Sequence, residues 1–94
     1  MILPVSEHDR AFVQELAGTI LEIDCADRVA LALERADVRE IPLAGKVGIV
    51  TLLRDDAEAL LRAFFDFRTY GKAGATEHRA LERLVPPLYA AVRG

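Results

Sequence analysis

The chain has 94 residues, of which 52% are hydrophobic and 29% are charged, and its formal net charge at pH 7 is −3. This length and composition correspond to one small folded domain, so we expect a single domain over residues 1–94. The acidic balance disfavours general nucleic-acid binding, because phosphate groups attract basic surfaces. No apolar run approaches the roughly 20 residues that span a bilayer, and a lone cysteine is typical of a reducing compartment, so the sequence predicts a cytoplasmic protein without a membrane segment.

The N-terminal third predicts two helices. Ser6 resembles a helix cap, and apolar side chains recur after it at helical spacing, which predicts a helix over about residues 7–22. Asp24 can cap a second helix over about residues 26–36, because that segment is rich in alanine, leucine, arginine and glutamate.

Residues 40–56, EIPLAGKVGIVTLLRDD, fit more than one structure. Ile41 precedes a proline, which favours extended geometry, and we expect a loop here in which Ile41 and Leu43 fill the core. The aliphatic residues that follow fit a buried helix or a strand, because periodicity does not separate short apolar runs. A strand would pair with the preceding segment in a hairpin at about 39–53, and such a hairpin is marginal without a third strand. We therefore predict a helix over about 46–53, and the alternative is an α+β fold that contains the hairpin.

The C-terminal half predicts further helices. Asp55 and Asp56 resemble helix caps, and the apolar side chains after them predict a helix over about 56–68. Near the end of the chain, two adjacent prolines interrupt an apolar stripe, which predicts a helix over about 77–85, a kink, and a short helix over about 87–93. The predicted fold class is therefore all-α, a compact bundle of five or six helices.

Gly45 and Gly48 enclose a lysine and a valine in a Gly-x-x-Gly pattern. A phosphate-binding P-loop requires Ser or Thr after Gly-Lys, and Val47 stands there, so that motif is excluded. The Gly-x-x-Gly loop of KH domains, which clamps a nucleic-acid backbone, matches over a short stretch. The match defines the alternative function, a small nucleic-acid-binding regulator that uses the Gly45–Gly48 loop.

The sequence contains no evident catalytic or metal centre. His8 and His78 are the only histidines, and each has acidic neighbours, as is common on solvated surfaces. Cys25 is expected to be a small buried group, and Asp24 and Asp27 beside it would raise its thiol pKa. We expect no catalytic residue, no metal and no cofactor, and hence a protein that is not an enzyme.

The order of the predicted elements resembles that of effector-associated domains from bacterial conflict and signalling systems, which are similar to the animal death fold. The resemblance spans about residues 10–68. The matching positions are Ala36, Asp37 and Val38, then Ile41, Pro42 and Gly45, then Leu52, Leu53, Leu60 and Leu61. The resemblance implies a helical adaptor domain that pairs with copies of itself or with like domains on effector proteins.

Charge is distributed unevenly along the chain. Residues 1–40 hold nine acidic and four basic side chains, whereas residues 41–94 hold six acidic and eight basic ones. We expect two complementary interface patches that meet head to tail between copies. The acidic patch consists of Glu15, Glu22, Asp24, Asp27 and Glu34. The basic and aromatic patch consists of Arg62, Arg68, Lys72, Arg79, Arg83, Phe67 and Tyr70. The expected partner is a protein, with a homo-oligomer possible, and neither nucleic acid nor a membrane is expected.

Overall fold

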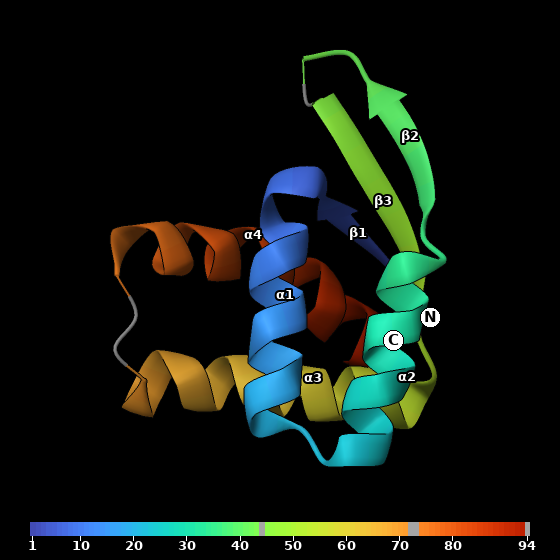
Figure 1. Ribbon diagram of the computed structural model, residues 1–94. Coiled ribbons are helices and arrows are strands. Elements are labelled where there is room, and N and C mark those ends of the chain that lie inside the picture. The colour runs from blue at the N-terminus through green and yellow to red at the C-terminus, as the bar shows by residue number, and fades with distance from the viewer. Residues whose placement is uncertain (44, 72–73, 94) are drawn as a thin grey trace.

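The computed structural model describes residues 1–43, 45–71 and 74–93, and the chain has an α+β fold (Figure 1). In chain order the elements are β1 (Ile2–Ser6), α1 (Glu7–Ile20), α2 (Ile23–Glu34), β2 (Asp37–Ile41), β3 (Gly45–Thr51), α3 (Arg54–Tyr70) and α4 (Ala75–Arg93). Within the described residues there are four helices and three strands. The predicted all-α bundle of five or six helices is therefore wrong, and the alternative α+β fold with a hairpin matches the structure.

The strands form one antiparallel sheet in the order β1–β3–β2. β3 lies in the centre, where Val50 is opposite Leu3 of β1, and Gly48 is opposite both Val5 of β1 and Val38 of β2. β2 and β3 are joined by a short turn, and β1 is brought to the other side of β3 by the path of the chain through α1 and α2. The first strand of the sequence therefore completes a sheet that begins as a local hairpin.

The presence of β1 explains why the residues predicted as a helix over 46–53 form a strand. A two-stranded hairpin is marginal in water, and a third strand with an apolar face supplies the missing burial. Val47, Ile49 and Val50 are β-branched, which suits a central strand. The sequence patterns predicted no strand over Ile2–Ser6, so the third strand that stabilises the hairpin was missing from the prediction.

β1 shows the two-residue alternation of a strand with one covered face. Leu3 and Val5 are each only 2% exposed, whereas Ile2 and Pro4 are exposed. Pro4 has no N–H to donate, and β1 lies at an edge of the sheet, which is where strands tolerate proline. The N-terminal segment thus buries two aliphatic side chains. Its proline, a residue that is rare in strands, makes the alternation of buried and exposed residues hard to identify from the sequence.

The helices α1, α2 and α3 lie close to their predicted positions. The Ser6 hydroxyl accepts a hydrogen bond of 3.2 Å from the Asp9 N–H, which confirms Ser6 as the cap of α1. α3 begins at Arg54, so Asp55 and Asp56 lie inside its first turn. Their predicted role as the caps of this helix is wrong, and Leu53 occupies the position before it without a side-chain cap.

α4 is one continuous helix, so the predicted kink and division into two helices are wrong. Pro86 and Pro87 lie inside it, and each removes a backbone N–H from the helical hydrogen-bond pattern. The carbonyls that lose these donors belong to Glu82 and Arg83, which are exposed, so water can satisfy them. Leu84 and Leu88, on either side of the prolines, are each 1% exposed and anchor both halves to the core.

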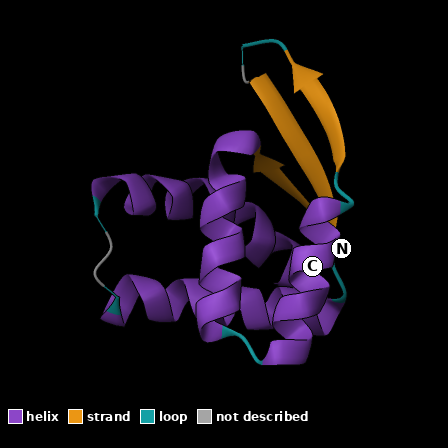
Figure 2. Cartoon of the chain, viewed as in Figure 1, coloured by secondary structure: helices purple, strands orange, loops and turns teal. Residues whose placement is uncertain are grey.

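The four helices gather on one face of the sheet and on the sides of β1, while the β2–β3 hairpin projects beyond them (Figure 2). The core joins inward side chains of β1 and β3 to apolar side chains of every helix, with Phe64 fully buried. On the outer face of the sheet, Ile2 and Pro4 are exposed and Val47 and Ile49 are half-buried. The sheet therefore has one covered face and one uncovered face.

The alternation in β1 predicts opposite outcomes for two adjacent substitutions. Leu3→Ala should lower the free energy of unfolding by about 2–4 kcal/mol, because it leaves a cavity in the core. Ile2→Ala, at an exposed position of the same strand, should lower it by less than about 1 kcal/mol. Urea denaturation followed by circular dichroism measures both values. Similar small losses in the two variants would show that the segment is not a strand anchored at Leu3.

Candidate functional site

Two carboxylates of the core are each held by an arginine, and both have structural roles. Asp9 at the start of α1 is 3% exposed, and it accepts hydrogen bonds from Arg83 of α4 at 2.6 Å from Nη2 and 2.9 Å from Nε. This two-pronged contact lowers the pKa of Asp9 below its ordinary value, although burial acts against it. The pair joins α1 to α4 across 74 residues of sequence. Arg83, which was assigned to the basic interface patch, is therefore engaged within the chain.

Asp56 of α3 is held by Arg28 of α2 in the same way. The carboxylate is 3% exposed and accepts hydrogen bonds of 2.9 Å from both Nε and Nη2 of Arg28, which lower its pKa. Cys25, one turn before Arg28, is buried, as predicted for this residue. Burial raises the pKa of the Cys25 thiol, and the nearby Asp56 carboxylate adds to that effect. The thiol is thus less reactive than an ordinary cysteine.

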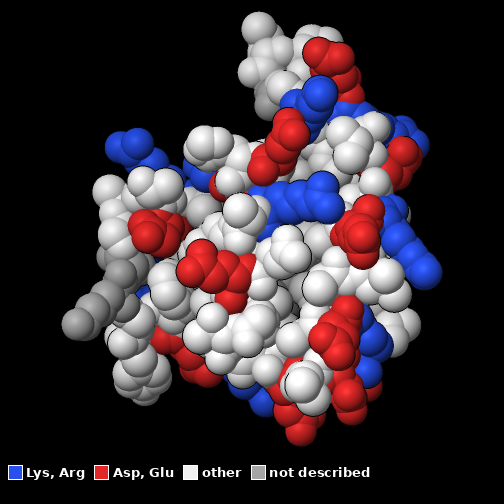
Figure 3. Space-filling view, viewed as in Figure 1, with Lys and Arg blue, Asp and Glu red and all other residues white. Residues whose placement is uncertain are grey.

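Most residues of the two predicted interface patches are exposed. All five residues of the acidic patch are exposed on α1, on α2 or between them. Figure 3 shows that on this face acidic and basic side chains are interspersed, and do not form one continuous patch. In the other patch, Arg62, Arg68, Arg79 and Tyr70 are exposed. Lys72 lies outside the described residues.

One shallow groove brings together residues from both predicted patches. It lies between α1 and α3 and is lined by Phe12, Glu15, Ile20 and Phe67, with Glu77 at its rim. Phe67 packs edge-on against Phe12, with ring centroids 5.6 Å apart, so it is half-buried. Glu15 of the predicted acidic patch and Phe67 of the predicted basic and aromatic patch thus line the same groove. The head-to-tail contact between copies stays a prediction.

The apolar residues near the tip of the β2–β3 hairpin are exposed, contrary to the prediction. Ile41 and Leu43 were expected to fill the core, but they are 43% and 109% exposed. Val38, lower on β2, is 55% exposed, and all five residues of β2 are classed as exposed. At the top of the view in Figure 3, the tip shows mainly uncharged surface. The two paired strands thus hold these apolar side chains in solvent.

The turn at the tip holds Leu43 in an uncommon backbone conformation. Its φ angle is +71°, in the left-handed region where glycine is usual and where a leucine costs about 1–2 kcal/mol. Pro42 precedes it and pre-sets the geometry of the turn. A glycine at position 43 would fit this turn with less strain. The chain instead carries a large apolar side chain there, fully in solvent.

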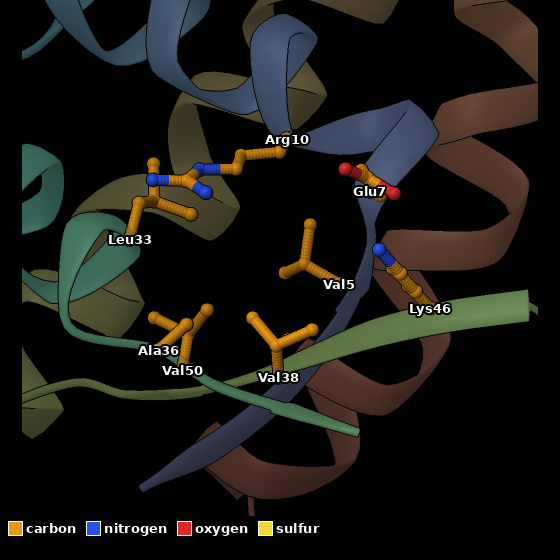
Figure 4. Close-up of a pocket in the computed structure, with 9 residues that line it drawn as sticks. Val5, Glu7, Arg10, Leu33, Ala36, Val38, Lys46 and Val50 are labelled. Carbon is orange, nitrogen blue, oxygen red and sulfur yellow. The ribbon is translucent and has the colours of Figure 1, made fainter. Parts of the chain in front are cut away.

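Beneath the hairpin lies a small cavity of about 40 Å³ (Figure 4). Its walls are apolar side chains of the sheet and of the end of α2, and Glu7, Arg10 and Lys46 lie toward its opening. The volume is far below the roughly 300 Å³ of a typical small-molecule site, so it does not enclose a cofactor or a substrate of ordinary size. The apolar walls are Val5, Leu33, Ala36, Val38, Gly48 and Val50.

The Gly45–Gly48 segment does not form the nucleic-acid clamp that its pattern suggested. Both glycines belong to β3, whereas the clamp of KH domains is a loop between two helices. Close packing explains the glycine at position 48, because a Cβ atom there would lie 3.2 Å from the Cβ of Ala36. Gly45 has a φ angle of +78° at the hairpin turn, which explains a glycine at that position.

No group of three or more metal-ligating side chains converges among the described residues, and His8 and His78 are both exposed. Among the described helices, none combines the length and apolar character needed to cross a lipid bilayer. Comparisons with models of protein families, with curated proteins and with solved structures return no match to this chain. The resemblance to effector-associated domains stays a prediction, and the all-helical fold that it implied is not the fold of this chain.

The two carboxylate–arginine pairs predict a loss of stability at acidic pH. Because the folded-state pKa values of Asp9 and Asp56 are lowered, the pairs contribute fully above the ordinary aspartate pKa of about 4 and are lost as pH falls below it. Urea denaturation from about pH 6 to pH 2 should show this decline. Asp9→Asn should lower stability by about 1–3 kcal/mol at neutral pH, since Arg83 is half-exposed, and should flatten the decline. Asp66→Asn removes an exposed carboxylate and should keep the wild-type slope.

Proposed function

We propose that this chain is a protein-binding module that associates with a copy of itself or with a similar domain, and that the β2–β3 hairpin is its contact element. The observation that carries the proposal is the set of exposed apolar side chains on this hairpin, Val38, Ile41 and Leu43. Contact surfaces between proteins have apolar, charge-poor centres, whereas scattered surface leucines are ordinary. Val38, Ile41 and Leu43 all belong to one element that projects beyond the helices (Figure 1), whereas the other exposed large apolar residues are distributed over the rest of the described chain.

The backbone conformation of Leu43 supports the same proposal. Strained positions persist where the surrounding structure holds them, and they gather at binding sites. A fully exposed leucine gains nothing for the isolated domain, because no part of its side chain is removed from water. Burial against a partner would turn that side chain into a contact worth about 1.5–3 kcal/mol.

Charged residues around the hairpin would select the partner. β2 carries Asp37, Arg39 and Glu40, and Lys46 lies opposite Glu40 on β3. Charges at the rim of an interface steer association and reject wrong partners more than they add affinity. We place the module in the cytoplasm, for which its single buried cysteine is suitable. The bacterial conflict or signalling setting rests on the sequence resemblance alone.

Nucleic-acid binding is the second candidate, and the order of elements favours it. Only Leu21 and Glu22 separate the consecutive helices α1 and α2, and a projecting hairpin follows them. Helix–turn–helix proteins place the second of two such helices in the DNA major groove. The exposed side chains of α2 here include Asp24, Asp27 and Glu34, which phosphate groups repel. This candidate therefore ranks second, and it predicts retention of DNA or RNA at low salt that Lys46→Asp weakens.

The protein-binding proposal predicts an association that depends on the hairpin tip. Sedimentation velocity should show that the average mass rises with concentration in the micromolar to millimolar range. Leu43→Gly should weaken the association about tenfold or more, because it deletes an apolar contact. It should leave stability within about 1 kcal/mol of the wild type, since glycine adopts this turn without strain.

Ile23→Ser provides the matched control, because Ile23 is a 77% exposed apolar residue at the start of α2, distant from the hairpin. This variant should associate like the wild type. A chain that stays monomeric up to about 1 mM would exclude self-association and leave only a similar domain as the partner. Equal weakening by Ile23→Ser and Leu43→Gly would count against the proposal, because it would assign the effect to general surface hydrophobicity.

A further inference from the structure

We propose that the partner is a second copy of this chain, docked along the free edge of β2, so that two β2 strands pair antiparallel about a two-fold axis at Val38. The inference rests on the proposed function and specifies its partner and its register. The product would be a six-stranded sheet that runs through both copies. Three properties of β2 carry the inference: its free edge, its charge order and the direction of its tip.

The outer edge of β2 is open for pairing. Among the described elements β2 contacts only β3, and all five of its residues are exposed. An edge strand presents unpaired backbone N–H and C=O groups, and adding a strand to such an edge is a recurrent mode of protein association. The opposite edge of the sheet differs, because α4 lies against β1. The hairpin edge is thus the one that a second chain can reach.

Symmetry restricts the possible registers. A two-fold axis perpendicular to the sheet places equivalent side chains of the two copies on the same face of the joined sheet. Directly opposed residues of an antiparallel pair also lie on one face. One residue must therefore lie opposite its own copy. A centre at Ile41, the last of the five residues of β2, would place Glu40 opposite Pro42 of the turn, which has no N–H to donate. The central residue is therefore Asp37, Val38, Arg39 or Glu40, and the side chains around it decide between these four registers.

Charge selects Val38 as the central residue. A centre at Asp37, Arg39 or Glu40 places that charged residue opposite its own copy, and like charges opposed on a sheet are destabilising. A centre at Val38 places Asp37 opposite the Arg39 of the second copy, twice by symmetry. Within one chain Asp37 and Arg39 already pair at 3.1 Å on an exposed surface. Pairing two copies would bring the Asp37–Arg39 pair of each copy side by side, so that four charges alternate in sign.

The same register covers the exposed apolar groups of the hairpin. Val38 meets its own copy on the inner face of the sheet, beside the small cavity whose wall it forms. Since the strands are antiparallel, the tip of each hairpin runs toward the place where β2 of the other copy leaves α2. Ile41 and Leu43 would thus be carried toward that end of α2, where Leu31 is 43% exposed. Pro42 donates no backbone hydrogen bond, so the ladder stops at the turn.

A charge-swap experiment tests the pairing. Asp37→Arg and Arg39→Asp, made singly, should each weaken dimerisation in sedimentation velocity by about tenfold or more, because each places like charges in opposition. The double variant restores opposite charges and should dimerise within about threefold of the wild type. Asp24→Arg changes the net charge by the same amount on α2, inside the predicted acidic patch, and should dimerise normally. Urea denaturation of each variant checks that the monomer remains folded.

Disulfide trapping tests the register independently of affinity. In the proposed pairing the Cβ atoms of the two Val38 residues lie about 4.5–5.5 Å apart, and a small movement of the two strands brings them within about 4.5 Å, so Val38→Cys should form a covalent dimer under mild oxidation. The two Glu40 residues would lie about 13 Å apart, and Glu40→Cys should not cross-link. The wild-type chain, whose Cys25 is buried, serves as the control.

The outcomes separate the inference from the function on which it rests. If association depends on Leu43 but is unchanged by the charge-swap variants, the β2 pairing is wrong and the module remains a protein binder. The same conclusion follows if Glu40→Cys cross-links and Val38→Cys does not. A chain that is monomeric at all concentrations overturns the two-fold dimer and leaves a similar domain as the partner that the module would bind. Restoration by the double swap together with selective trapping of Val38→Cys supports the two-fold dimer.

Discussion

The pairing of β1 with β3 is the interaction on which the rest of this structure depends. Five residues at the start of the chain lie beside a strand that ends at Thr51, and they turn a marginal hairpin into a three-stranded sheet. Leu3 and Val5 then form part of the surface on which the helices pack. Without this strand, residues 45–51 would lack one of their two neighbours, and the helices would lack a sheet to cover.

The helices are connected to one another by apolar packing and by two buried carboxylates. Each carboxylate belongs to the first turn of its helix, and each is held by an arginine from a distant helix, Asp9 by Arg83 and Asp56 by Arg28. Such pairs contribute little when fully exposed, and here the acid is buried while the arginine reaches solvent. These pairs stabilise the fold and also fix the relative orientation of two helices, because a two-pronged contact has a defined geometry.

The sheet is covered on one face and open on the other, and its hairpin extends past the helical body (Figure 1). This asymmetry explains which apolar side chains of the sheet are exposed. Leu3 and Val5 of β1 and Val50 of β3 point inward and are buried, whereas β2 contacts only β3 among the elements that the structure describes. β2 is therefore the part of the sheet that the described elements leave uncovered, and this is the physical reason that the hairpin is the candidate site.

The sequence by itself determined α1, α2 and α3 to within a few residues at each end, because their apolar periodicity and the Ser6 cap are local signals. The helix that it predicted over 46–53 and the division that it predicted in the last helix were wrong. The sequence also indicated a buried Cys25 and the absence of a sequence motif for phosphate binding. Only the tertiary structure decided the state of residues 45–51, since a short aliphatic run fits a helix or a strand equally well until its neighbours are known. The pairing of Asp56 with Arg28 and of Asp9 with Arg83 links positions far apart in the chain, and no local pattern announces it. The exposure of Ile41 and Leu43 was likewise hidden, because whether an apolar side chain is buried depends on which surface folds over it, and over β2 none does.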